Sequence, residues 1–121
     1  MTAAEAFEFD VSERLRRQAL ELPGVEEGSS CVNRAFKAGG KNFAFVGERQ
    51  GACTLRLKLA DALPEIHRLA ERHPDRYEVG TAGWTLVTFP PDDPPADDET
   101  ARWIVESYRL LAPKRLSAEL D

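Results

Sequence analysis

Residues that supply metal ligands and nucleophiles are scarce in this sequence. Its 121 residues include two cysteines and two histidines. Cys31 and Cys53 stand far apart and make no CxxC pair, so we expect free thiols, a nucleophilic or redox cysteine being the alternative. His67 and His73 fall on a predicted helix without the i,i+4 spacing of zinc ligands. We therefore expect no metal, no cofactor and no enzymatic activity.

Long apolar runs and a leader sequence are also missing. No apolar run approaches the roughly 18 residues that a membrane span needs. The first residues, MTAAEAFEFDVSERL, contain neither a basic start nor an apolar stretch, which argues against a signal peptide. We expect a cytoplasmic protein that is a monomer and has no membrane partner.

Positive charge is not in excess. Sixteen Lys and Arg residues against 21 Asp and Glu residues give a net charge of -5. This balance argues against a protein that coats nucleic acid through its overall charge. It leaves room for a local basic patch, so the distribution of the charges over the fold has to decide.

The order of apolar patterns predicts a single α+β domain over residues 1–121, with residues 1–9 frayed. A first helix is expected to be capped by Asp10 or Ser12 and to end before Pro23. Its apolar residues recur along one stripe: Val11, Leu15, Ala19 and Leu22. The polar residues 26–30 are interpreted as a connection.

Three strands are expected next, at residues 34–38, 41–46 and 52–59, joined as a meander by short turns. The remaining elements are predicted in this order: a helix over 60–72, strand candidates at 76–79 and 83–89, a Pro- and Asp-rich loop over 90–98, and a last helix that Asp97 or Asp98 caps and Pro113 ends. The fold class is therefore α+β, an antiparallel sheet with N- and C-terminal helices on one face and the other face partly open.

The register of the meander follows from its turns. A two-residue turn at Gly39-Gly40 pairs Lys37 with Asn42, and a loop over residues 47–51 then pairs Asn42 with Arg56. Lys37, Asn42 and Arg56 would form a row across the open face, because side chains alternate between the two faces of a sheet. The same register sends the large apolar residues inward: Phe36, Phe43, Phe45, Leu55 and Leu57.

Five motifs occur in sequence along the chain: LPGVEEG at 22–28, AFKAGGKNFAFV at 35–46, LRLKL at 55–59, GWTLV at 83–87 and WIVESYRLLAPKRL at 103–116. In this order and spacing, from about residue 12 to 116, they resemble the MmcQ/YjbR family. The resemblance implies a frataxin-like (CyaY-like) fold and a DNA-binding role through a double-wing arrangement of hairpins. A fold by itself does not fix a function.

The resemblance also assigns basic residues. Lys37 and Lys41 stand in its strand–turn–strand signature, Lys58 stands in the following strand, and Lys114-Arg115 stand in the basic tail of the closing helix. Many relatives carry a basic or histidine-aromatic segment just before the tryptophan of the late strand. Residues 79–83 of this chain carry no charge there, so that hairpin would lack phosphate contacts.

The candidate nucleic-acid-binding residues are the polar side chains of the open face together with the basic residues that the resemblance adds: Lys37, Asn42, Arg56, Lys58, Lys41, Lys114 and Arg115. The cations would meet phosphates, and Asn42 would bond a base or sugar edge. The alternative is that these residues only keep a half-exposed sheet soluble. Few phosphate contacts and little aromatic surface predict weak, salt-sensitive, non-specific DNA binding.

A protein partner is the alternative to DNA. Trp103 and Leu110 line up on the last helix and would form an exposed apolar strip for a regulatory adaptor, unless Trp103 is buried together with Trp84. The arginines of the first helix, Arg14, Arg16 and Arg17, alternate with glutamates and are expected to form a solvated face. A small-ligand pocket between helices and sheet is a third hypothesis.

Overall fold

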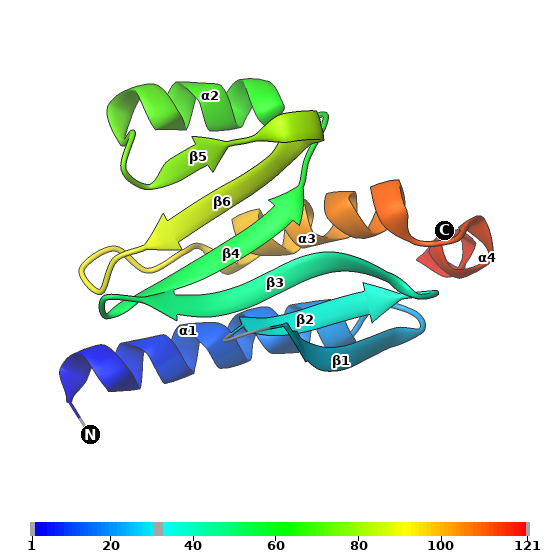
Figure 1. Cartoon of the computed structure of the whole chain (residues 1–121), viewed down its shortest axis with the longest axis horizontal. Coiled ribbons are helices and arrows are strands. Elements are labelled where there is room, and N and C mark those ends of the chain that lie inside the picture. The colour runs from blue at the N-terminus through cyan, green and yellow to red at the C-terminus, as the bar shows by residue number, and fades with distance from the viewer. Residues whose placement is uncertain (1, 31–32, 121) are drawn as a thin grey trace.

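A computed structural model describes residues 2–30 and 33–120 (Figure 1). Cys31 lies outside the described residues. The elements are α1 (Ala3–Leu20), β1 (Val25–Ser30), β2 (Asn33–Ala38), β3 (Lys41–Arg49), β4 (Ala52–Lys58), α2 (Leu63–Arg72), β5 (Tyr77–Val79), a 3-10 turn η1 (Thr81–Gly83), β6 (Trp84–Phe89), α3 (Asp97–Leu111), α4 (Lys114–Ser117) and η2 (Ala118–Leu120).

The strands form a six-stranded antiparallel sheet over the described residues, in the order β1-β2-β3-β4-β6-β5. The predicted α+β class, with one face of an antiparallel sheet covered by helices, is confirmed. β1 corrects the prediction that residues 26–30 are a polar connection. An edge strand can be held by backbone hydrogen bonds to one neighbour without an apolar side-chain pattern. The polar sequence of β1 therefore did not predict a strand.

Helices α1 and α3 pack on β3 and β4, and in Figure 1 β4 passes in front of α3, so that view looks onto the open face. α2 lies beside β5 at the end of the sheet. The largest fully buried side chains lie between sheet and helices: Trp103, Tyr108, Phe36, Phe43, Phe89, Leu15, Leu55, Leu57, Leu59, Ile66, Ile104 and Val11. None of the helices in the described part of the chain is long and apolar enough to cross a membrane.

The first helix starts earlier than predicted. It is helical from Ala3 and is capped by Thr2, whose side-chain oxygen accepts a hydrogen bond of 3.1 Å from the Glu5 amide. Asp10 and Ser12 lie inside the helix, so the predicted cap and the predicted frayed segment are wrong. Threonine followed three residues later by glutamate is the capping-box pattern, a signal that was present in the sequence.

The last helix also differs at both ends. Its cap residue is Ala96, and Asp97 and Asp98 lie in the first turn, where their charge suits the positive helix end without capping it. α3 ends at Leu111, close to the predicted stop at Pro113. Lys114 and Arg115 do not complete α3, because they open the short helix α4.

The β2–β3 hairpin has the predicted turn and a different register beyond it. Gly39 and Gly40 adopt positive φ values of 59° and 85°, and Lys37 pairs with Asn42 as predicted. The next pair is Phe36 with Ala44, so Phe43 is an extra residue in β3. This bulge turns both Phe43 and Ala44 towards the helices, where each is fully buried.

The β3–β4 hairpin is tighter than predicted. Arg49 pairs with Ala52 across a two-residue turn, Gln50-Gly51, with φ values of 54° and 83°. Residues 47–49 therefore continue β3 and do not form a loop. Arg56 pairs with Phe45, not with Asn42. The predicted inward position of Phe45 is wrong as well, because the bulge and this register place it opposite Arg56 on the open side of the sheet.

Candidate nucleic-acid interface

The open face is defined by the alternation along β4, the central strand. Leu55 and Leu57 are fully buried on the helix side, so Arg56 and Lys58 project from the other side. Residues directly opposite each other share a face, which adds Phe45 on β3 and Trp84 and Leu86 on β6.

The predicted open-face residues do share one surface. Lys37 and Asn42 are exposed cross-strand partners near the β2–β3 turn, and Arg56 and Lys58 follow on β4. We call Lys37, Asn42, Arg56 and Lys58 the open-face group. Asn42 and Arg56 are not opposite each other, so the predicted row across three strands is wrong, although all four side chains remain on the uncovered side.

An aromatic cluster, which the sequence reasoning missed, occupies the middle of this face. The Arg56 guanidinium carbon lies 5.3 Å from the ring centre of Trp84 and 5.9 Å from that of Phe45. The two ring centres are 6.2 Å apart. Both rings are only partly buried, so flat aromatic surface and a cation are presented together. The expectation of little aromatic surface on this face is therefore corrected.

The open-face cations form no ion pairs with the described residues, although a carboxylate stands next to Lys37 on β1. Lys37, Arg56 and Lys58 form no ion pair with any described residue, whereas Arg49, further along β3, lies 3.7 Å from Glu78. By the register, no carboxylate projects from the open side of β2, β3 or β4. The carboxylates on this face stand at the outer strands: Glu26 on β1, directly opposite Lys37, and Glu78 on β5.

A hollow adjoins the aromatic cluster. It has a volume of about 370 Å³ and is lined by Arg56, Glu78, Val79, Gly80, Thr81, Trp84 and Leu86. Its position follows from the η1 turn, in which Ala82 and Gly83 have positive φ values of 57° and 84°. A side chain at Gly83 would collide with the Leu59 carbonyl, so this turn presses against the end of β4.

Lys41, Lys114 and Arg115 form a second basic region around the β2–β3 turn. Lys41 pairs with Ala38, which is fully buried on the helix side. A side chain at Gly39 would collide with the Pro113 ring, so the β2–β3 turn is packed against the start of α4. We call these three cations the turn-end group. The seven predicted residues thus divide between two surfaces.

Two of the three first-helix arginines, Arg14 and Arg16, act within the fold, while Arg17 is exposed. Arg14 lies 2.9 Å from Asp97, and Arg16 lies 2.7 Å from Glu27. Arg34 lies 3.0 Å from Glu13 and joins the same network. These ion pairs tie α1 to α3 and to the β1–β2 hairpin, which fits the predicted solvated face better than a binding stripe.

The apolar-strip hypothesis loses Trp103, and the cysteine hypothesis loses Cys53, while Cys31 lies outside the described residues. Trp103 is fully buried, so the proposed apolar strip of Trp103 and Leu110 does not exist, although Leu110 is 43% exposed. Cys53 is a free, fully buried thiol. Burial, together with the nearby Glu48 and Glu8 carboxylates, raises the pKa of Cys53 to about 12, so it remains protonated at neutral pH.

A family model described as YjbR matches residues 20–110. The chain belongs to the YjbR family. The predicted family resemblance is thereby confirmed, while its frataxin-like component stays a prediction. No curated protein and no solved structure matches the chain.

The YjbR match spans the whole sheet and nearly all of α3. The open-face group and the aromatic cluster lie inside it, and Lys114 and Arg115 lie beyond it. A signal for the position of Trp84 was present in the sequence: Trp84 is the first residue of β6, an alternating strand in which Thr85, Val87 and Phe89 are buried. That alternation by itself places Trp84 on the opposite face.

Proposed function

We propose that this YjbR-family protein is a non-enzymatic module that binds DNA through the open face of its sheet. The observation that carries the proposal is the set of three cations without ion-pair partners, Lys37, Arg56 and Lys58, on strands whose open side carries no carboxylate. Charges left unpaired on one surface are available to phosphate groups.

The net charge and the number of cations support a weak interaction. The whole chain carries a charge of -5, so attraction depends on the local patch. Each phosphate contact with a duplex contributes about -0.9 to the slope of log K against log salt, so three contacts predict a slope of about -2 to -3. Affinity should fall roughly ten- to fifty-fold between about 50 and 200 mM salt.

The experiment measures fluorescence anisotropy of labelled DNA at about 50 and 200 mM salt. The double variant Lys37→Glu, Arg56→Glu should abolish most of the affinity and flatten the salt dependence, because it reverses two charges on the face. The matched control is Lys114→Glu, Arg115→Glu, which changes the net charge equally at the turn-end group. This control variant should lose only the small part of the DNA affinity that depends on overall charge.

Two outcomes contradict the proposal. One is the absence of any anisotropy change at about 50 mM salt and high protein concentration. The other is an equal loss of affinity in both double variants, which would mean that DNA responds to net charge and not to the open face. Thermal unfolding of each variant checks that the fold is intact.

A further inference from the structure

We infer that the DNA on the open face is single-stranded and that an unpaired base stacks on Trp84 at the hollow beside it. This inference rests on the proposed function and adds the class of substrate. It draws on three independent features of this face: its strand turns, its aromatic cluster and the placement of its carboxylates.

The two described turns that border the open-face strands, β2–β3 and β3–β4, do not suit insertion into a duplex groove. A major groove admits a helix or a projecting two-stranded ribbon. Helices α1 and α3 lie on the other side of the sheet. The β2–β3 turn is packed against Pro113, and the β3–β4 turn is flanked by Arg49, which is paired with Glu78. These elements therefore offer the flat surface of a sheet, and not a helix or a hairpin that projects into a groove.

The aromatic cluster suits a base that has left the helical stack. Trp84 is half-buried and lies next to a hollow of about 370 Å³, which falls within the size range of ligand pockets. Leu86 gives this hollow an apolar wall, and Arg56 lies over the Trp84 ring. Sheets that bind single strands use such aromatic side chains to stack bases, while nearby cations hold the backbone.

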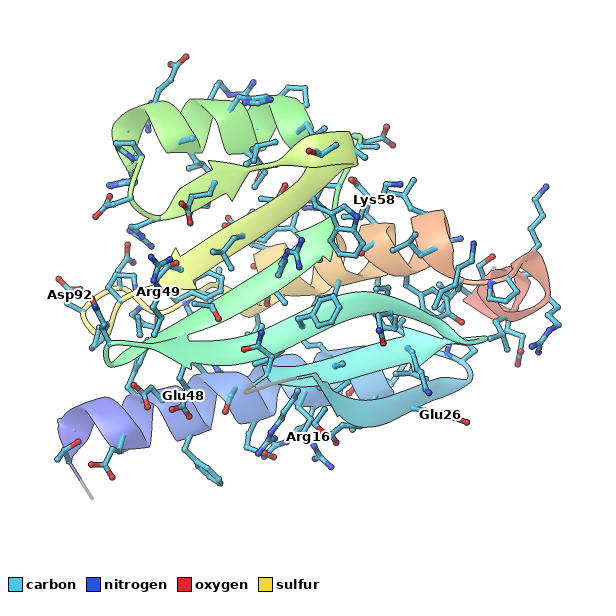
Figure 2. All side chains as sticks on the ribbon, viewed as in Figure 1. Arg16, Glu26, Glu48, Arg49, Lys58 and Asp92 are labelled. Carbon is cyan, nitrogen blue, oxygen red and sulfur yellow. The ribbon has the colours of Figure 1, made fainter. Side chains whose placement is uncertain are left out.

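The charges orient the strand. Lys58 pairs with Trp84 across β4 and β6, whereas Glu78 lines the far side of the hollow. Figure 2 shows Lys58 and Arg49, the ion-pair partner of Glu78, towards opposite ends of the sheet. Because Glu78 repels phosphate, the backbone should follow Lys58 and Arg56 while the base edge points towards Glu78; Lys37, opposite Glu26, should contribute less.

The first test compares strands by competition, with an unlabelled 15-nucleotide single strand and the same sequence as a duplex displacing a labelled single strand. The single strand should compete at least about ten-fold better, because stacking on an aromatic ring adds affinity that a paired base does not gain. Equal or stronger competition by the duplex would overturn the inference. So would an RNA strand of the same sequence that binds ten-fold more tightly than the DNA.

The second test reads the base contact directly. The chain has two tryptophans, and Trp103 is fully buried. In the variant Trp103→Phe, Trp84 is the remaining tryptophan, and its fluorescence should be quenched when the single strand binds. In the matched variant Trp84→Phe, emission comes from Trp103 and should not change. Should Trp103→Phe not fold, the difference between wild type and Trp84→Phe gives the same reading. Binding without any quenching assigned to Trp84 would contradict stacking.

A third test separates this inference from the proposed function. Trp84→Ala should weaken single-strand binding about ten-fold and leave the salt slope unchanged, because a ring and not a charge is lost. Trp84→Leu keeps apolar bulk and should lose nearly as much. Should duplex and single strand bind equally, with binding still lost in Lys37→Glu, Arg56→Glu, the proposed function stands and this inference fails. If no DNA binds, both fail.

Discussion

The two faces of this sheet are made by the same strands, but the side chains on them make different kinds of contact. On the helix side, Phe43 meets Tyr108 edge to face at 5.4 Å, and Ser107 links the backbone of two strands. On the open side, the Arg56 guanidinium lies beside two neighbouring aromatic rings and has no ion-pair partner among the described residues. The covered face stabilises the fold, and the uncovered face leaves cations and aromatic surface exposed to solvent.

The bulge in β3 creates this difference. Phe43 and Phe45 are two positions apart, a spacing that normally puts two side chains on one face. The extra residue at Phe43 places Phe43 in the core and Phe45 beside Arg56. Because of this one extra residue, Phe45 lies on the open face, whereas Phe43 lies in the core.

The comparison is sharpest between these two phenylalanines. Phe43→Ala should lower the free energy of unfolding by about 3–5 kcal/mol, because it removes a fully buried ring from the core. Phe45→Ala should cost about 1 kcal/mol, since it loses mainly its contacts with Trp84 and Arg56. Denaturant unfolding of both variants measures the ratio of the two losses in unfolding free energy. Equal losses would show that Phe45 also belongs to the core.

Ser107 tests how the helix side is held to the strands. Its hydroxyl donates to the Phe43 carbonyl at 2.6 Å and accepts from the Lys58 amide at 3.0 Å. Ser107→Ala leaves both groups without this partner and should cost about 2 kcal/mol in unfolding free energy. The control Ser117→Ala, near the surface in α4, should change stability by less than about 0.5 kcal/mol. A loss in Ser107→Ala no greater than in the control would contradict this role.

On the helix side, Glu8 is a buried carboxylate that lowers the stability of the folded state at neutral pH. Burial and the neighbouring Glu48 carboxylate raise the pKa of Glu8 above its ordinary value. A raised pKa in the folded state means that the native protein loses stability as pH rises through that value. Glu8→Gln should therefore raise the melting temperature at pH 7, and this gain should vanish below about pH 4, where glutamic acid is protonated in both states.

The pH dependence has an internal control. Glu48→Gln removes the other carboxylate of the pair and should raise the melting temperature at pH 7 as well. The double variant should gain less than the sum, because either change alone relieves the same repulsion. Additive gains, or a gain that is unchanged at acid pH, would show that the two carboxylates do not interact.

The smallest effect is expected at the α2–α3 contact. Arg102 donates to both carboxylate oxygens of Glu65, each at 3.0 Å. The pair is exposed to solvent, so Arg102→Ala should cost less than about 1 kcal/mol and should cost less still in high salt. Thermal unfolding at low and high salt checks this. A large, salt-independent loss would mean that the arginine stem packs as part of the core.

Much of the sheet could be predicted because its signals are local. The alternation in β4 separated Leu55 and Leu57 from Arg56 and Lys58, and the structure keeps that separation. Gly39-Gly40 predicted the first turn, because two successive residues with positive φ favour glycine.

The remainder depends on features that leave no local signal. Residues 43–46 are all apolar, so hydrophobic patterning fits either face and cannot reveal a bulge. Gln50 adopts a positive φ that glutamine rarely takes, so the second turn looked like a longer loop. The place of Phe45 in the aromatic cluster was missed because it depends on this register, which puts Phe45 opposite Arg56, whereas the place of Trp84 follows from the alternation of β6.

The strand β1 has a consequence for self-association. It lies at one edge of the sheet, so its outer backbone groups could pair with the same strand of another molecule. Glu26 projects from the open side of this strand and Glu27, which pairs with Arg16, from the helix side, so two copies brought edge to edge would add a second Glu26 carboxylate to the same edge. Like-charge repulsion thus discourages fibril growth at neutral pH, and acidification would remove that protection.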